Sequence, residues 1–352
     1  MTGVTELFGL TRSELEEAMT ALGMKPFRGR QIFRWLYQGL EPDLSHMTDI
    51  AKDARASLAG RFTVRPLAAP EVVTSADGTA KYRFTLDDEA VIESVLIPEK
   101  DRLTLCLSTQ VGCPLGCLFC RTGSLGFTRD LTTREIIGQL WEVQRQVRET
   151  GKRVTNVVFM GMGEPLLNLD NTIAVIRIML DDLGFNLSNR RVTVSTIGIP
   201  GKIDELGGQV AVNLALSLHA TTDAKRAALM PATKNWPLKE LLAAIRRFPL
   251  PTRKRVLLEY VLLDGVNDSS ADARELVKIA RSISAKVNLI PFNSFPGAPF
   301  RPSGPKTTVA FQQVLWDHGM MAIIRKSRGD EHLAACGQLG YVPLSEDSEE
   351  DE

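Results

Sequence analysis

Residues 103–120 read Leu-Thr-Leu-Cys-Leu-Ser-Thr-Gln-Val-Gly-Cys-Pro-Leu-Gly-Cys-Leu-Phe-Cys, a short apolar run followed by three cysteines within eight residues. The run at 103–109 has the length and composition of a buried strand. A closed zinc site needs a fourth ligand, but the four histidines at 46, 219, 318 and 332 are all distant in sequence. Thiolates of Cys113, Cys117 and Cys120 on a cubane of four irons would instead leave one iron open to a small molecule.

After this motif, short apolar runs alternate with longer helical periods. Strands are predicted at 103–109, 154–160, 190–195, 210–218, 254–262 and 286–291, and helices at 132–149, 168–182, 200–206, 237–247 and 269–283. Such alternation indicates βαβ units and a parallel sheet. Periodicity alone does not choose between an incomplete barrel and a doubly wound sheet. In a barrel, functional groups gather at the C-terminal ends of the strands.

The part of the chain before this region has a different pattern. Residues 1–65 read as helical, with Thr11 and Glu14 forming a capping box and further helices over 28–38 and 47–59. Residues 70–98 alternate like strands, with turns at Asp77-Gly78 and Asp87-Asp88. Residues 25–37 hold three arginines, one lysine and four aromatic residues but no acid, a composition that suits contact with nucleic acid. We therefore divide the chain into a helical accessory domain expected to bind RNA (1–65), a β linker (66–101), a core (102–304), a C-terminal extension (305–344) and a disordered acidic tail (345–352).

The composition is that of a globular protein and argues against a disordered chain or a membrane-spanning protein. Of the 352 residues, 44% are hydrophobic and 24% are charged, as in a globular protein, and no run of 18 apolar residues predicts a transmembrane helix. The N-terminus lacks the continuous apolar core of a signal peptide. The number of cysteines, five, is odd, so structural disulfides are not expected to pair them all. Both observations favour a reducing cytoplasmic location. Without the six acids of the tail the body is mildly basic, which permits nucleic-acid binding. The tail by itself needs no role beyond solvation.

Polar residues follow several predicted strands. Gly161-Met162-Gly163-Glu164-Pro165 ends the second strand, where glycine lets the backbone approach a ligand closely. Ser195, the Ser217-Leu218-His219 triplet and Asn293 stand at three further strand ends. Taken singly, each is typical of a cap or a turn. Taken as a set, they predict a pocket.

Two cysteines lie outside the cluster motif. Cys106 is on the strand just before the motif, and Cys336 lies in a small, polar segment near the C-terminus. A lone buried thiol is usually inert. The segment around Cys336 reads as a loop, however, which favours a chemical role for this thiol.

At this point the chain resembles the RlmN/Cfr family of radical S-adenosylmethionine (SAM) rRNA methyltransferases, nearly end to end. The resemblance is carried by the C-x3-C-x2-C motif, by the Gly161–Leu167 turn, and by the segments at 105–113, 289–293 and 336–339. The helical N-terminus with Phe27-Arg28-Gly29-Arg30-Gln31 is more similar to RlmN than to Cfr. The implied fold is a partial (βα)6 radical SAM barrel preceded by a small helical domain and a short antiparallel segment.

The resemblance implies an activity. Its product would be 2-methyladenosine at adenosine 2503 of 23S rRNA, and many bacterial members also modify adenosine 37 of tRNAs. Cys336 would take a methyl group from one SAM, and a second SAM, cleaved at the [4Fe-4S] cluster, would give a 5′-deoxyadenosyl radical that activates this methyl. The resulting carbon radical would add to C2 of the base. Cys106 would then release the product by forming a transient disulfide with Cys336.

The resemblance also implies roles for further residues and partners. Glu93 matches the proton acceptor of the family. The implied SAM ligands are Gly163, Glu164, Ser195, Ser217, Leu218, His219 and Asn293. RNA contacts are expected from Arg28, Arg30, Arg34, Lys254 and Arg255, the last two within a run of nine bases and one acid between 225 and 255. We expect a monomer without a membrane partner, reduced by an external donor of the flavodoxin type.

Two rival functions use the same sequence features. A Cfr-like enzyme would methylate C8 of the same adenosine with the same five cysteines, and only the N-terminal region argues against it. An RNA-binding protein with a structural metal site would hold zinc and would leave Cys106 and Cys336 without a role. One departure from the family pattern lies at 328–333, where Arg-Gly-Asp-Glu-His-Leu is less acidic than expected.

Overall fold

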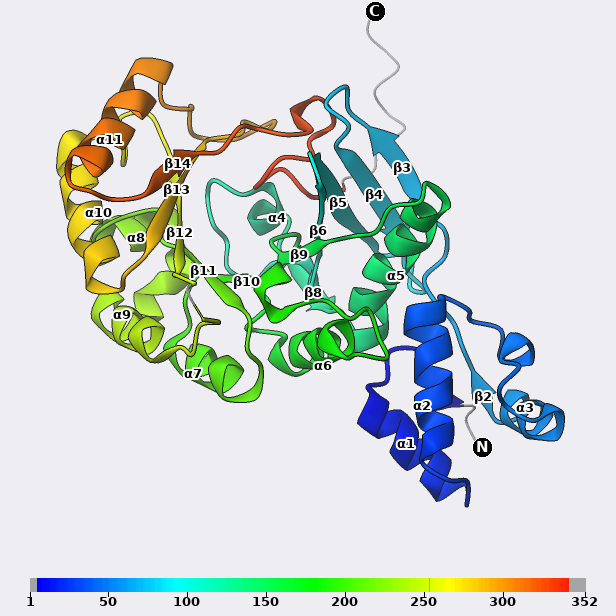
Figure 1. The fold of residues 1–352 in the computed structure, drawn as a ribbon. Coiled ribbons are helices and arrows are strands. Elements are labelled where there is room, and N and C mark those ends of the chain that lie inside the picture. Colours follow the sequence, from blue (N-terminus) through cyan, green and yellow to red (C-terminus); the bar gives the residue numbers. More distant parts are fainter. Residues whose placement is uncertain (1–4, 253, 342–352) are drawn as a thin grey trace, which may run out of the picture.

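The computed structural model describes residues 5–252 and 254–341, and Figure 1 shows a helical N-terminal part beside a large curved sheet. The N-terminal elements are β1 (Thr5–Glu6), α1 (Arg12–Ala21), α2 (Phe27–Arg34), a π-helical turn (Trp35–Gly39), a 3-10 turn (Leu44–His46), α3 (Lys52–Ala59) and β2 (Phe62–Thr63). The predicted capping box is confirmed, because Thr11 and Glu14 each accept from the backbone N–H of the other. The helix predicted over 47–59 begins only at Lys52, because turns occupy the residues before it.

Ten strands form one continuous sheet in the order β14-β13-β12-β11-β10-β9-β6-β5-β4-β3. They are β3 (Glu71–Thr74), β4 (Ala80–Thr85), β5 (Val91–Glu99), β6 (Arg102–Cys106), β9 (Asn156–Phe159), β10 (Val192–Thr196), β11 (Asn213–Ser217), β12 (Leu257–Leu262), β13 (Lys286–Pro291) and β14 (Ala322–Ile324). β3, β4 and β5 are antiparallel and are joined by the two predicted turns. Since β5 also pairs with β6, the segment that we expected to be a linker continues the main sheet.

The strands β6 and β9 to β14 are parallel and adjacent in chain order. A doubly wound sheet would reverse its winding at an internal strand, and no reversal occurs among the strands that the structure describes. The intervening helices are α5 (Thr133–Glu149), α6 (Leu169–Leu180), α7 (Pro200–Gln209), α8 (Asp223–Leu229), α9 (Leu238–Arg247), α10 (Ser270–Ser282) and α11 (Pro305–Asp317). They follow the outer side of the curved sheet (Figure 1), so the prediction of a partial barrel is confirmed.

The barrel contains one parallel strand more than the six predicted. In the segment that we expected to form only a C-terminal extension, α11 and β14 add another helix and strand to the sheet. β14 has only three residues, and one of its apolar side chains, Ile323, is exposed. Such a short strand has no recognisable pattern in sequence.

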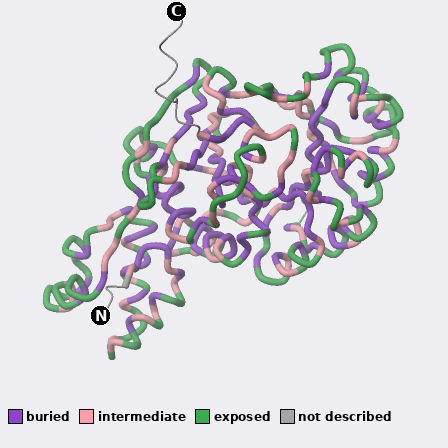
Figure 2. Tube along the Cα trace, turned by 180° about the vertical axis from the view of Figure 1, so that it is seen from behind, coloured by how far each residue is buried: buried purple, intermediate pink, exposed green. Residues whose placement is uncertain are grey.

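The hydrophobic core is shared by the N-terminal part and the barrel. Figure 2 shows buried residues along the sheet and the inner sides of the helices, and one apolar cluster extends from Leu7 to Leu339. Trp141 of α5 connects the two parts, because its indole Nε1 donates to the Leu36 carbonyl at 2.7 Å and its ring meets Phe8 edge-on. The N-terminal helices are thus packed against the barrel.

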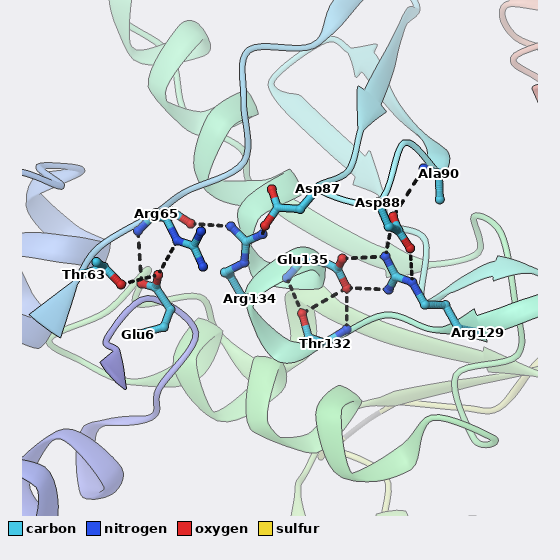
Figure 3. Close-up of polar contacts among 10 residues, drawn as sticks. All are labelled: Glu6, Thr63, Arg65, Asp87, Asp88, Ala90, Arg129, Thr132, Arg134 and Glu135. Atoms are coloured by element: carbon cyan, nitrogen blue, oxygen red, sulfur yellow. Dashed lines mark hydrogen bonds and ion pairs between the residues drawn. The ribbon is translucent and has the colours of Figure 1, made fainter. Parts of the chain in front are cut away.

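A polar junction at the start of α5 adds to this packing (Figure 3). Arg134 donates to the Arg65 carbonyl at 2.8 Å and pairs with Asp87 in the turn between β4 and β5. Arg129 in β8 (Phe127–Asp130) pairs with Asp88 of the same turn. The junction therefore joins the N-terminal part, the antiparallel strands and the hairpin next to the cysteine motif.

The ion pair between Arg129 and Glu135 within this junction predicts a pH dependence of stability. Burial raises the pKa of Glu135, but hydrogen bonds from Arg129 and Thr132 outweigh it and hold the pKa below its usual value of 4.5. A lowered folded-state pKa gives stability that is present above the unfolded pKa and is lost as the pH falls through the folded one. We expect Arg129→Met to lower the free energy of unfolding by roughly 2 kcal/mol at pH 7.

The measurement is thermal unfolding of wild type and Arg129→Met between pH 3 and pH 7. The difference in Tm should shrink as the pH falls below about 4.5, because Glu135 is then neutral in the unfolded and eventually in the folded state. Arg247→Met is the matched control, since Arg247 pairs with Asp204 on the surface. That variant should cost less than about 1 kcal/mol. A pH-independent difference for Arg129→Met would contradict the assignment.

Candidate active site

The three cysteines of the motif lie in a loop at the C-terminal end of β6. The short strand β7 (Gln110–Gly112) pairs with β8 and leads into Cys113, whose N–H donates to the Gly126 carbonyl at 2.7 Å. Gly112 has a φ of +73°, and a Cβ there would lie 2.0 Å from the Gly126 oxygen, so only glycine fits. Cys120 caps the short helix α4 (Arg121–Ser124).

These cysteines face an open cavity together with most of the predicted SAM ligands. The predicted residues that line it are Cys113, Cys117, Cys120, Gly163, Glu164, Ser195, Ser217, His219, Asn293 and Cys336. They come from the cysteine loop, from the C-terminal parts of β9 to β13 and from the C-terminal segment. Leu218 is fully buried behind the cavity wall, where its N–H donates to the Glu259 carbonyl.

The donor set fits a multi-iron cluster better than a single ion. Within the described residues no three His, Cys, Asp or Glu side chains converge on one metal position. Thiolates of a cubane bind different iron atoms, so they need to share a cavity but not a point. Their pKa values are raised by burial, at Cys113 to about 12, so without a bound metal these thiols stay protonated.

Arg226 gives a second reason for this fit. The side chain is fully buried, its Nη2 donates to the Ile197 carbonyl at 2.7 Å, and its Nη1 has no hydrogen-bond partner among the described residues. Burial lowers the pKa of Arg226 to about 10, while the charges of Asp223 and, to a smaller extent, of Cys117 act in the opposite direction. A buried cation needs an opposite charge, and three thiolates bound to a cluster would add to the one that Asp223 supplies.

The glycine-rich turn after β9 packs closely against Gln110. Gly163 has a φ of +97°, and its Cα faces Gln110, whose Oε1 accepts from the Glu164 N–H at 2.8 Å. The Glu164 carboxylate accepts from the N–H groups of Ile197 and Leu166. Burial raises the pKa of Glu164 to about 7. This carboxylate is therefore held rigidly at the cavity wall, where a bound cation would favour its ionised form.

Replacement of Gly163 by alanine should distort this turn. The new Cβ would lie 2.6 Å from the Gln110 Cβ, and the φ of +97° is unfavourable for any L side chain. We expect a loss of roughly 2 kcal/mol in the free energy of unfolding and at least about tenfold weaker SAM binding, measured by chemical denaturation and equilibrium dialysis. Gly208→Ala is the control, because a Cβ there meets no atom within 4 Å. Unchanged SAM affinity in Gly163→Ala would contradict the role of the turn.

His219 lies at the end of β11 with a φ of +56°. Its Nδ1 accepts from the Val261 N–H at 3.0 Å, and its ring meets Phe119 of the cysteine loop edge-on. Burial lowers the pKa of His219 to about 3, so the ring is neutral and carries its proton on Nε2. Thus His219 supports the cysteine loop and offers one N–H donor.

Cys336 borders two cavities. It lines the larger one with the three motif cysteines and a smaller one with Cys106. Cys336 is exposed, whereas Cys106 is buried and its pKa is raised by burial to about 12. The two thiols therefore share one cavity, but only Cys336 is open to solvent.

Neighbouring elements hold the segment that carries Cys336. The Asn293 side chain donates to the Cys336 carbonyl at 3.0 Å, and the Arg121 N–H donates to the Gly337 carbonyl at 2.7 Å. The Thr122 hydroxyl donates to the Leu339 carbonyl. Side chains of the segment itself are buried on both sides of the exposed cysteine. Hence the segment is anchored at several points and presents one thiol.

Glu93 does not line either cavity. This buried residue of β5 is 1% exposed, and its carboxylate pairs with Lys81 at 3.0 Å and accepts from the Gly340 N–H at 2.8 Å. The next cation, Arg83, stacks on the ring of Tyr341. In this conformation Glu93 fastens the C-terminal segment to the antiparallel strands.

Three charged residues near the cavities lack a signal in the sequence. Arg325, directly after β14, lines both cavities, and its pKa is raised mainly by Cys336. Glu259 of β12 lines the larger cavity. Arg226 belongs to the basic run that we expected to form an RNA surface, and this expectation is wrong for Arg226 because it is buried. Strand pairing brings Glu259 and Arg325 to the site, whereas Arg226 reaches it from α8.

The predicted RNA-binding residues lie in two places. Arg28, Arg30 and Arg34 are on α2, where Arg30 pairs with Glu16 and Arg34 with Asp49. Lys254 and Arg255 are exposed just before β12. The pKa of Lys254 is lowered by burial and by three nearby cations at positions 190, 191 and 286. The structure does not bring the two groups into contact.

Comparisons with known proteins cover almost the whole chain. Residues 5–64 match the family model of the ribosomal RNA large subunit methyltransferase N-terminal domain, and residues 107–277 match that of the radical SAM superfamily. The dual-specificity RNA methyltransferases RlmN of Geobacter sulfurreducens and Pelobacter propionicus are each 48% identical to this chain, over 96% of it and 93% and 96% of their own lengths. The crystal structure of a radical SAM methyltransferase from Sphaerobacter thermophilus is 44% identical, with a TM-score of 0.88 over 95% of this chain and 99% of that one. None of the described helices has the length and apolar character needed to cross a membrane.

Proposed function

Because this chain belongs to the RlmN family of radical SAM RNA methyltransferases, we propose that it methylates C2 of adenosine 2503 in 23S rRNA and of adenosine 37 in tRNAs. The observation that carries this proposal is the position of Cys336. It stands between a cavity with the three motif cysteines and a cavity with Cys106. All five cysteines thereby fall within one connected site.

The cofactors define the first part of the site. Cys113, Cys117 and Cys120 would hold a [4Fe-4S] cluster, and Glu164, Ser195, Ser217, His219 and Asn293 line the cavity in which SAM would bind. When bound, the cluster supplies an electron that cleaves SAM to a 5′-deoxyadenosyl radical.

The two thiols act in sequence in this proposal. Cys336 accepts the methyl group of one SAM through its sulfur, since it is the exposed thiol. Loss of one hydrogen to the radical of a second SAM turns the S-methyl group into a carbon radical, which adds to C2 of adenine. The adduct must then give up one electron, which the oxidised cluster would accept, and the C2 proton. The Cys106 thiolate then attacks the Cys336 sulfur and forms a disulfide, while the released methylene carbon takes up a proton to become the methyl group of the base. An external reductant must reopen this disulfide before the next turnover.

Glu93 is our proposed acceptor of the C2 proton. The contact that occupies its Oε2 comes from Gly340, four residues after Cys336. Movement of this segment during the transfer of Cys336 from the SAM cavity to Cys106 would uncover the carboxylate. The proposal thus ties the availability of the base to the movement of the methyl-carrying loop.

RNA and protein partners follow from the same proposal. The arginines of α2 together with Lys254 and Arg255 would contact phosphates of 23S rRNA and tRNA, with the target base unstacked into the cavity. Electrons would come from a flavodoxin-type donor, and the enzyme would act as a cytoplasmic monomer. Methylation whose salt dependence weakens in Arg28→Ala or Lys254→Ala would support these contacts.

The test is nucleoside mass spectrometry of 23S rRNA and tRNA from a strain that lacks the gene, with and without a plasmid copy. We expect 2-methyladenosine to disappear on deletion and to return with the wild-type copy. Disappearance of 8-methyladenosine instead would assign the chain to the Cfr branch. If neither nucleoside changes, the protein is no adenosine methyltransferase, and the metal-bound RNA-binding function would replace the proposal.

A further inference from the structure

Glu259 is a buried carboxylate that faces the larger cavity and is only partly satisfied. It is 4% exposed and lines the cavity together with Arg325 and Cys336. Its Oε1 accepts from the Asn288 side chain at 3.2 Å, whereas its Oε2 has no hydrogen-bond partner in the part of the chain that the structure describes. The cations whose charges act on it, Arg325 and Lys286, form no ion pair with it among the described residues.

Such an acceptor is costly unless something pairs with it. Burial raises the pKa of Glu259, and the charges of Arg325 and Lys286 act against this shift without forming a direct contact. An unsatisfied buried carboxylate oxygen destabilises a protein by more than a hydrogen bond contributes. A bound molecule is therefore expected to donate a hydrogen bond to Oε2, since no group in residues 5–252 and 254–341 does so.

The position of Glu259 indicates which molecule this is. It is the third residue of β12, paired in register with Ser217 of β11 and Asn288 of β13, and so lies deeper than the rim residues His219 and Asn293 that follow their strands. Arg325, whose charge acts on Glu259, also lines the cavity shared by Cys106 and Cys336. Glu259 therefore lies in the same cavity as Cys336, on the side where Arg325 connects it to the second cavity.

We propose that Glu259, positioned by Asn288, accepts a hydrogen bond from the exocyclic 6-amino group of the target adenine and thereby selects adenosine. This inference rests on the proposed function and names the specificity determinant of that site. The 6-amino group is the only hydrogen-bond donor on the ring edges of a neutral adenine in RNA. Guanine and uracil present carbonyl oxygens at the corresponding positions, which a carboxylate repels. Cytosine also carries an exocyclic amino group, so the contact with Glu259 rejects guanine and uracil, and the smaller size of the pyrimidine ring distinguishes cytosine.

The test combines a protein variant with a modified RNA. Hairpins that contain either adenosine or purine riboside at the target position differ only in the 6-amino group, and both retain C2–H. Dissociation constants and methylation rates are measured for both RNAs with the cluster-loaded full-length wild type, Glu259→Met and Glu259→Gln. A hydrogen bond to a charged acceptor predicts that wild type favours adenosine by about 10- to 100-fold.

In Glu259→Met the preference should fall to about onefold for binding and for rate, because the acceptor is gone. Glu259→Gln keeps one acceptor oxygen and should retain part of the preference. Glu142→Met is the matched control, since Glu142 is equally buried on α5 but lines neither cavity, and its preference should equal that of wild type. Cluster content and Tm of each variant show whether it is folded.

Two results would overturn the inference. An unchanged preference for adenosine in folded Glu259→Met would show that another group reads the base. Loss of SAM affinity in this variant with the preference preserved would assign the acceptor to a SAM hydroxyl or amino group. Failure of the proposed function is distinguishable from both, because wild type would then methylate neither hairpin.

Discussion

Cells that lack the chromosomal gene and carry the Cys336→Ala variant are expected to contain no 2-methyladenosine above the level of the deletion strain. The methyl group has no other carrier, because the only other thiol outside the cluster motif, Cys106, is buried. Removal of a covalent nucleophile eliminates its pathway altogether, so the rate should fall by roughly a thousandfold or more. The variant should keep its fold, since Cys336 is exposed.

The informative control for Cys336→Ala is cleavage of SAM without RNA. The three cluster cysteines and the residues around Glu164 are unchanged, so purified Cys336→Ala should bind iron and sulfide as wild type does and should still release 5′-deoxyadenosine when it is reduced. A variant that retains methylation would show that Cys336 is not the methyl carrier. A variant that loses the cluster would instead show that Cys336 helps to hold it.

Replacement of Cys106 by alanine is expected to trap the enzyme on its RNA. In our proposal the base is first joined to Cys336 through the transferred carbon, and only attack by Cys106 on that sulfur breaks the link. Cys106→Ala should therefore perform one round of addition and then stop. Denaturing gels of enzyme treated with SAM, reductant and a labelled hairpin should show a protein–RNA adduct in high yield, whereas wild type shows little.

The double variant Cys106→Ala and Cys336→Ala is the control for the trapped complex and should form no adduct, because it lacks the attachment point. Val158→Ala changes a neighbouring strand in the same sheet but leaves both thiols in place, and it should turn over. Normal turnover in Cys106→Ala, with no adduct, would exclude a resolving role for this thiol. Cys106, whose pKa is raised by burial to about 12, would then serve only as a packing residue.

The pattern of the sequence predicts most of the barrel. Apolar runs separated by helical periods identify β6 and β9 to β13 within a few residues, because buried parallel strands and amphipathic helices differ in length and period. The capping box at Thr11 places the first helix for an equally local reason. β14 stays undetected, because three residues carry no period and its pairing with β13 is set by tertiary packing.

The same division holds at the active site. The spacing of the motif cysteines is enough to predict that they belong to the site. Glu164 and His219 are predicted from their positions just after strands, and all of these residues line the larger cavity. The roles of Glu259 and Arg325 depend on which side of a strand faces the barrel and on which strands are neighbours. That information is absent from local sequence. Glu93 could be selected from the family resemblance. Its contact with the Gly340 N–H, which occupies the carboxylate, could not be predicted from the sequence.

Because β14 is an edge strand of the sheet, it can influence the mobility of the segment that follows it. Hydrogen exchange commonly reveals local opening at short marginal strands long before central strands open. β14 pairs on one side only, through three residues, and the chain runs directly from it into the segment that carries Cys336. Amides of β14 and of 325–341 should therefore exchange faster than those of β10 and β11. Fraying of this edge strand would let Cys336 shift between its two cavities while the central strands of the barrel keep their hydrogen bonds.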